Sequence, residues 1–415
     1  MSLSLLKQKI IVASIEDAKL AALERMLLLS CFFNLAITAL LGVLLRSYPF
    51  IDGFPLDYKN VLHGHSHFAF GGWIMPALLL LILKYFPEIK NGIGYKHWKN
   101  ISLLLLFSAY GMLLTFPFQG YKPLSIFFST LSVAAGYYLV VVLWPTLNRT
   151  SLSHRFLKAG LIYLAISATG PFATGPMIAM GHQGTPMYFD AVYFYLHFQV
   201  NGWFTFAVLA LLYRWMENKG LKVTNVRSYK LFHLACAPAY LLSVLWNRPG
   251  LVFNTIGGIA TLLQAIALGH LLKDLKGFKL TTLMKLGLAA FVIKIVLQLL
   301  SSIPFIAVLA YEHRNFIIAY LHLALLGSVS LFLFHFCFET FDVRTKTVKI
   351  GTALFLISFF CTELLLVLFS LGSLLGFGIP HYNEVLLLAS TLFPAGLLLI
   401  FLSTRQKLRN KLQLN

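Results

Sequence analysis

Apolar residues are gathered in long runs that short polar segments separate. Twelve runs cover about 26–45, 60–83, 101–118, 123–147, 159–180, 190–213, 231–247, 251–272, 284–310, 315–338, 350–372 and 385–403. A helix needs roughly 20 largely apolar residues to cross a bilayer, and most of the runs reach that length. The pattern therefore predicts an all-α, polytopic membrane protein with about twelve transmembrane helices and the lipid bilayer as its surroundings.

The composition excludes the soluble classes of protein. Apolar residues make up 59% of the 415 residues and charged residues only 11%, against about 25% charged residues in soluble domains. So few charges cannot cover the surface of a soluble globule of this size. The net charge of +19 does not indicate a nucleic-acid partner, because the basic residues lie in short loops between apolar runs.

The distribution of lysine and arginine predicts how the chain is oriented. With twelve spans, both termini and the loops on their side carry 27 of these residues, and the opposite loops carry five. Positive loops stay in the cytoplasm, so both termini are expected there and the protein in the cytoplasmic (inner) membrane. We expect a leader at 1–25, one twelve-helix domain at 26–404 and a basic tail at 405–415.

Histidines on the second, sixth and tenth runs are the main candidates for metal ligands. They are His63, His65, His67, His197 and His322. At 1.5 Å per residue, His65, His197 and His322 lie roughly 8–12 Å below the outer ends of their spans. A shared depth on three helices suits a buried cofactor, and neutral imidazole ligates haem iron, copper and zinc. The alternative for each is an interhelical hydrogen bond.

Other polar residues add candidates near the outer surface and within the bilayer. Arg248 and Arg314 lie in outer loops, where they could bind the propionates of a haem or act as ordinary interfacial anchors. Lys294 shares a helical face with Gln298 in the ninth span. A lysine at that depth is expected to pair with an acid or to take part in proton transfer.

Two short stretches resemble subunit I of the haem–copper oxidase superfamily. His65 stands eleven residues before Pro76 in Met75-Pro-Ala-Leu, as the haem-binding histidine of helix II does in that family, and Ala319-Tyr-Leu-His322 is similar to its helix X motif. The resemblance implies a cytochrome oxidase subunit I-like bundle. A low-spin haem would lie between His65 and His322, and His197 would correspond to a copper ligand on helix VI.

The chain also departs from that family. Tyr320 stands where the family has its high-spin haem ligand, and the paired histidines of helix VII are missing. Tyrosine can ligate haem iron, so Tyr320 could hold a second haem. His197, with His63 or His67, would face an incomplete second site. One histidine cannot make the family's three-histidine copper site, so copper is a weaker expectation than haem.

The resemblance implies electron transfer, or handling of oxygen or nitric oxide, with a redox partner subunit or cytochrome. His322-Leu-Ala-Leu-Leu-Gly327 is also similar to a family of twelve-span haem- and copper-binding proteins linked to nitric oxide stress. No CxxCH motif is present, which excludes covalent haem in this chain. The alternatives are a cofactor-free transporter with a histidine and lysine proton relay, and a membrane enzyme acting on lipids.

Overall fold

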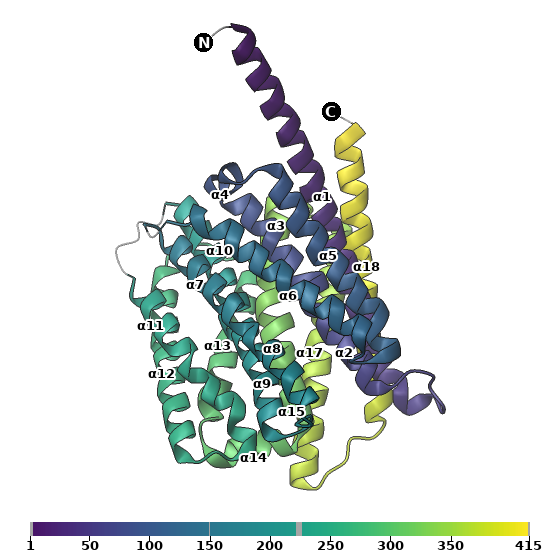
Figure 1. The fold of residues 1–415 in the computed structure, drawn as a ribbon. Coiled ribbons are helices and arrows are strands. Elements are labelled where there is room, and N and C mark those ends of the chain that lie inside the picture. Colours follow the sequence, from purple (N-terminus) through teal and green to yellow (C-terminus); the bar gives the residue numbers. More distant parts are fainter. Residues whose placement is uncertain (1–2, 149, 221–225, 414–415) are drawn as a thin grey trace. The chain divides into compact units, whose positions relative to one another are not determined.

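The computed structural model describes residues 3–148, 150–220 and 226–413, with side chains from Ile15 onward. Every regular element in this part of the chain is a helix (Figure 1). Eleven helices in it are long and apolar enough to cross a membrane. The prediction of an all-α, multi-pass membrane protein is therefore confirmed at this level.

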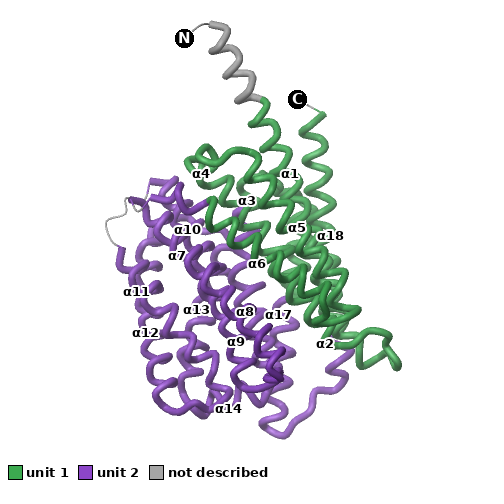
Figure 2. Tube along the Cα trace, viewed as in Figure 1, with its two compact units in different colours: residues 1–142, 337–358, 387–415 green, residues 143–336, 359–386 purple. Residues whose placement is uncertain are grey.

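The described chain divides into two compact units, each with its own packing (Figure 2). Unit 1 comprises residues 1–142, 337–358 and 387–415. Its N-terminal elements are α1 (Leu3–Ser47), η1 (Tyr48–Phe50), α2 (Tyr58–Phe68), η2 (Ala69–Ile74), α3 (Met75–Tyr85), α4 (Pro87–Gly92), α5 (Tyr95–Gln119) and α6 (Pro123–Leu143). The expected leader is thus continuous with the first span, within α1.

Unit 2 comprises residues 143–336 and 359–386. Its elements are η3 (Trp144–Thr146), α7 (Leu152–Ser167), α8 (Thr169–Ala179), α9 (Pro186–His197), η4 (Phe198–Phe204), α10 (Thr205–Asn218), α11 (Arg227–Cys236), η5 (Pro238–Asn247), α12 (Leu251–Asp274), α13 (Thr282–Leu300), α14 (Pro304–Glu312), α15 (Arg314–His322) and η6 (Leu323–Ser330). Three further helices, α16 (Leu331–Thr340), α17 (Lys346–Leu375) and α18 (Tyr382–Gln413), contribute to both units.

The seventh predicted span, 231–247, is not one α-helix. It consists of α11, which ends at Cys236, and the 3₁₀ helix η5, which begins at Pro238. Proline has no N–H to donate and its ring clashes with the carbonyl four residues before it. After the proline the hydrogen bonds tighten, and the Tyr240 N–H donates to Ala237. The seventh predicted span is not among the eleven long apolar helices of the described chain.

The ninth predicted span, 284–310, is also interrupted. The helix α13 ends at Leu300 and α14 begins at Pro304, for the same reason that proline does not continue a helix. Asn254 on α12 donates a hydrogen bond to the Ser302 carbonyl at 2.9 Å. A carbonyl at the interruption thus receives a hydrogen bond from a neighbouring helix. Backbone groups inside a bilayer need such partners because no water is available there.

Helices α17 and α18 pack closely within unit 1. Ser358 donates to the Ala389 carbonyl at 2.6 Å, and the Phe355 and Phe393 rings lie 5.2 Å apart. The ends of α1 and α18 that carry the chain termini lie on the same side of this unit (Figure 1).

Candidate functional site

The histidines of α2 face two different helices. His63 and His67 are four residues apart and both contact the end of α5. The His67 ring stacks on Phe116 at 4.4 Å, and its Nε2 lies 3.1 Å from the Tyr121 hydroxyl. His63 packs edge-on against Tyr121 at 4.8 Å. This pair therefore belongs to an aromatic cluster between α2 and the chain that follows α5.

His65 points toward α1 instead. Its Nδ1 lies 2.9 Å from the Thr38 carbonyl oxygen, and because a carbonyl can only accept, Nδ1 carries the proton. The lone pair of this tautomer is on Nε2, the nitrogen that a metal would take. A Cβ at Gly42 would come within 3.4 Å of the His65 ring, so the glycine leaves room for the ring against α1.

His322, at the end of α15, has a similar environment in unit 2. Its Nδ1 lies 3.3 Å from Oε1 of Glu363 on α17, and both side chains are largely buried. The two atoms are close without being aligned as a hydrogen bond. A metal-bound histidine almost always offers its second ring nitrogen to a carboxylate or a backbone carbonyl. His65 and His322 are both placed in this way.

His197 is used differently. Its Nε2–H donates to the Cys236 carbonyl at 2.8 Å, and its Nδ1 faces the Asn201 amide at 3.2 Å and the Ser243 hydroxyl at 3.4 Å. Both ring nitrogens therefore have protein partners within unit 2. The copper-ligand role that the resemblance implied for His197 does not fit this arrangement, and we do not propose it.

The break after α11 explains the bond that His197 makes. Pro238 cannot continue the helix, so carbonyl groups near the end of α11 lose their usual partners. His197 donates a hydrogen bond to the Cys236 carbonyl, and the Tyr163 hydroxyl donates one to the His233 carbonyl at 2.9 Å. The sequence left an interhelical hydrogen bond open as the alternative role of each histidine. His197 makes such a bond.

We expect His197→Ala to lower the stability of the protein by about 1–3 kcal/mol, the cost of leaving a buried carbonyl without a donor. The measurement is the apparent melting temperature in detergent. His182→Ala is the matched control, because His182 is exposed and its loss should change little. Equal melting temperatures for the two variants would contradict the capping role.

Lys294 has no acidic partner among the described residues. It is buried on α13, and its Nζ donates to Gln298 Oε1 on the same helix at 3.2 Å. Among the acids in the apolar helices, Asp190 accepts from the Trp246 indole at 3.1 Å and Glu363 lies beside His322. The expected lysine–carboxylate pair is therefore not found, although the shared face with Gln298 is.

The remaining candidates lie near one end of unit 2. Arg248 follows η5 and lies 3.8 Å from Glu312, with both side chains mostly exposed. Arg314 begins α15 and is exposed, and Tyr320 is half-buried on the same helix. An exposed pair of this kind contributes little to stability, so Arg248 remains open to a charged group outside the chain.

No group of three or more histidine, cysteine or acidic side chains is placed to hold a metal ion within the described part of the chain. A haem iron with two axial histidines would need only two such side chains, one on each face of the haem. His65 belongs to unit 1 and His322 to unit 2.

The sequence analysis did not predict that each of the three spans with candidate histidine ligands contains a π-helical turn. The turns η2, η4 and η6 begin within two residues after His67, His197 and His322. Such turns are rare and frequently occur at functional sites. The sequence signal was present: His-Phe-x-x-x-Gly-Trp occurs at 67–73 and 197–203, and His-Leu-x-x-x-Gly-Ser at 322–328. This is a weak internal repeat of about 125–130 residues.

The glycine of each motif lies against an aromatic ring. A Cβ at Gly72 would meet the Phe68 ring at 2.8 Å, one at Gly202 the Tyr163 side chain at 2.5 Å, and one at Gly327 the Phe359 ring at 2.8 Å. The widened turn and the missing side chain together let a ring pack close to the backbone. The repeated motif therefore specifies the local backbone of three spans, beyond the histidine itself.

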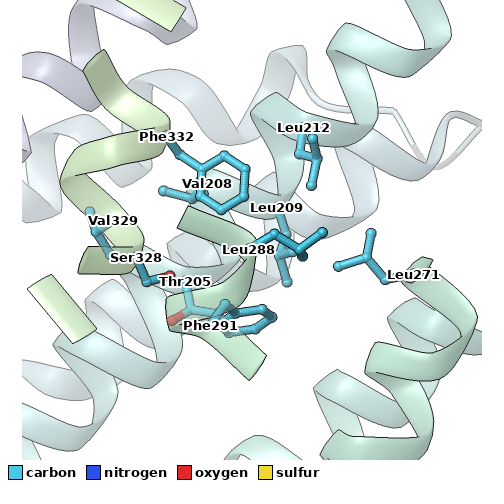
Figure 3. Close-up of a pocket in the computed structure, with 10 residues that line it drawn as sticks. All are labelled: Thr205, Val208, Leu209, Leu212, Leu271, Leu288, Phe291, Ser328, Val329 and Phe332. Carbon is cyan, nitrogen blue, oxygen red and sulfur yellow. The ribbon is translucent and has the colours of Figure 1, made fainter. Parts of the chain in front are cut away.

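An apolar cavity lies in unit 2 between α10, α12, α13 and the chain from η6 to α16 (Figure 3). Its volume is about 10 Å³, roughly the space that one water molecule needs. Its lining is aliphatic and aromatic apart from Thr205 and Ser328. With no charged side chain, it is not a site for a polar substrate.

Comparison with known proteins gives no assignment: no family model matches the chain, and no curated protein is significantly similar to it.

Proposed function

We propose that this chain is a haem-binding, multi-pass membrane protein in which His65 and His322 are the axial ligands. The observation that carries the proposal is the environment of Nδ1 in these two residues. A backbone carbonyl lies 2.9 Å from it in His65, and a carboxylate oxygen lies 3.3 Å from it in His322. Both are the kind of partner that orients an imidazole for iron. The oxidase-like motifs selected the same two histidines.

The other candidate ligands fit an iron less well. The ring nitrogens of His197 bond to its own unit, and Nε2 of His67 faces the Tyr121 hydroxyl. His63 packs edge-on against Tyr121 in the same aromatic cluster. Only two of the five candidates thus combine a bilayer position with an acceptor beside Nδ1.

A bound haem would supply a reversible one-electron change, and the chain's own residues would hold and insulate it. The proposed role is electron transfer, or handling of oxygen or nitric oxide, with a redox partner subunit or cytochrome. Arg248 and Arg314, at one end of unit 2, are the proposed contacts for the carboxylates of the haem. The excess of basic residues on the side of the termini supports placement in the cytoplasmic membrane with the termini inside.

A second candidate is a cofactor-free transporter, which one observation favours. Lys294 is buried without an acidic partner in the described chain, beside Phe291 and Gln298. A lone lysine inside a bilayer is costly and is often functional. Protein purified without colour, even from cells supplied with haem, would favour this candidate.

The deciding experiment is the visible spectrum of the detergent-purified protein before and after dithionite. We expect a Soret band and, on reduction, a sharp α-band, because two imidazoles make haem iron low-spin. Carbon monoxide added afterwards binds only a haem iron with an open position. It therefore reports whether a second haem, of the kind that Tyr320 would ligate, is present. No Soret absorbance after expression with added haem would overturn the proposal.

A further inference from the structure

Glu363 occupies an unusual place for a carboxylate. It lies near the middle of α17, roughly 26 Å from the helix start at 1.5 Å per residue. Its side chain is 16% exposed. Ionisable groups at such depth are costly and are usually found with a partner or a function. Lys294, the buried lysine of α13, bonds to Gln298 and not to this carboxylate.

The neighbour of Glu363 is His322. The carboxylate Oε1 lies 3.3 Å from Nδ1 of the ring, and the histidine side chain is 28% exposed. The exposed part of the ring can face a ligand while Nδ1 faces the carboxylate. At 3.3 Å the two atoms are within the distance of a charge-assisted hydrogen bond, which is stronger than one between neutral groups.

The helices that carry this pair are held together on both sides of it. One turn away on each helix, Ala319 and Leu366 share a buried cluster with Leu386. Near the start of α15, Asn315 donates at 3.2 Å to the hydroxyl of Tyr382 on α18, the helix that also supplies Leu386 to this cluster. In the other direction Gly327 lies so close to Phe359 that an added Cβ would meet the ring at 2.8 Å. The pair is therefore held by rigid packing.

We propose that Glu363 is the positioning residue for His322. It accepts a hydrogen bond from Nδ1–H, fixes the tautomer that leaves the lone pair on Nε2, and makes the imidazole a stronger electron donor. The inference rests on the proposed function, in which Nε2 of His322 ligates haem iron. A negative partner on the ligand favours the ferric state, so Glu363 lowers the midpoint potential of that haem.

The test is a redox titration of the haem in the purified full-length protein and in Glu363→Gln. Glutamine keeps the shape and an acceptor oxygen but removes the charge. We expect haem to stay bound and the ratio of reduced to oxidised haem at a fixed potential to rise about tenfold or more. For a one-electron couple this is a positive shift of about 59 mV. A merely structural glutamate would leave the potential unchanged.

Two further variants complete the test. Glu384→Gln is the matched control, because Glu384 lies 3.6 Å from His381 and both side chains are exposed. The haem in this variant should have the same midpoint potential as in the parent protein. Glu363→Asp keeps the charge and should stay closer to the parent than Glu363→Gln. Equal potentials for the parent and Glu363→Gln would overturn the positioning role while leaving the haem intact. A parent protein without haem would instead overturn the proposed function.

Discussion

Replacing His65 or His322 with alanine is expected to abolish the sharp α-band of the dithionite-reduced protein. Each residue would supply one of the two axial nitrogens, and the iron becomes five-coordinate when one of them is lost. The effect is all-or-none in the spectrum, because a low-spin haem requires both strong ligands. The measurement is the reduced-minus-oxidised difference spectrum, together with the amount of haem per protein.

Matched controls come from the second and sixth predicted spans. His67→Ala and His197→Ala remove histidines whose rings are used within the protein, by Tyr121 and by Cys236. Both should keep the α-band, although His197→Ala should be less stable. An α-band that survives in His322→Ala but vanishes in His197→Ala would contradict the ligand assignment and favour the helix VI residue.

Gly351→Ala and Gly396→Ala are expected to destabilise unit 1 strongly, although each adds only one methyl group. The two glycines face each other across α17 and α18. A Cβ on either would lie 2.5 Å from the carbonyl oxygen of the other. Small residues allow such close helix contacts in membranes, and two backbones cannot give way as a side chain can. We expect a loss of about 1–3 kcal/mol, the usual range for overpacking.

The control for this prediction is Gly269→Ala. Gly269 lies within α12, and nothing lies within 4 Å of the Cβ that alanine would add. Alanine favours a helix over glycine by about 0.5–1 kcal/mol, so this variant should melt at the same temperature or slightly higher. Apparent melting temperatures in detergent compare the three variants. A Gly351→Ala protein as stable as Gly269→Ala would show that the two helices can separate without cost.

The candidate site was only partly visible in the sequence. His65 and His322 were selected by their place in oxidase-like motifs, but the partners Thr38 and Glu363 come from distant segments. No periodicity links residue 322 with residue 363. The weak repeat around His67, His197 and His322 was readable, yet only the π-helical turns gave it a structural meaning.

The apolar pattern alone was enough to predict a helical protein suited to a bilayer, because runs of about 20 apolar residues with few charges have no other stable environment. It also located eleven of the spans. The change to a 3₁₀ helix after Pro238 was not predicted, although proline is its local cause. Which histidines bond within the protein became visible only from the packing of the helices. Hydrophobicity is a property of each segment, whereas the hydrogen-bond partner of a ring nitrogen depends on how the segments pack.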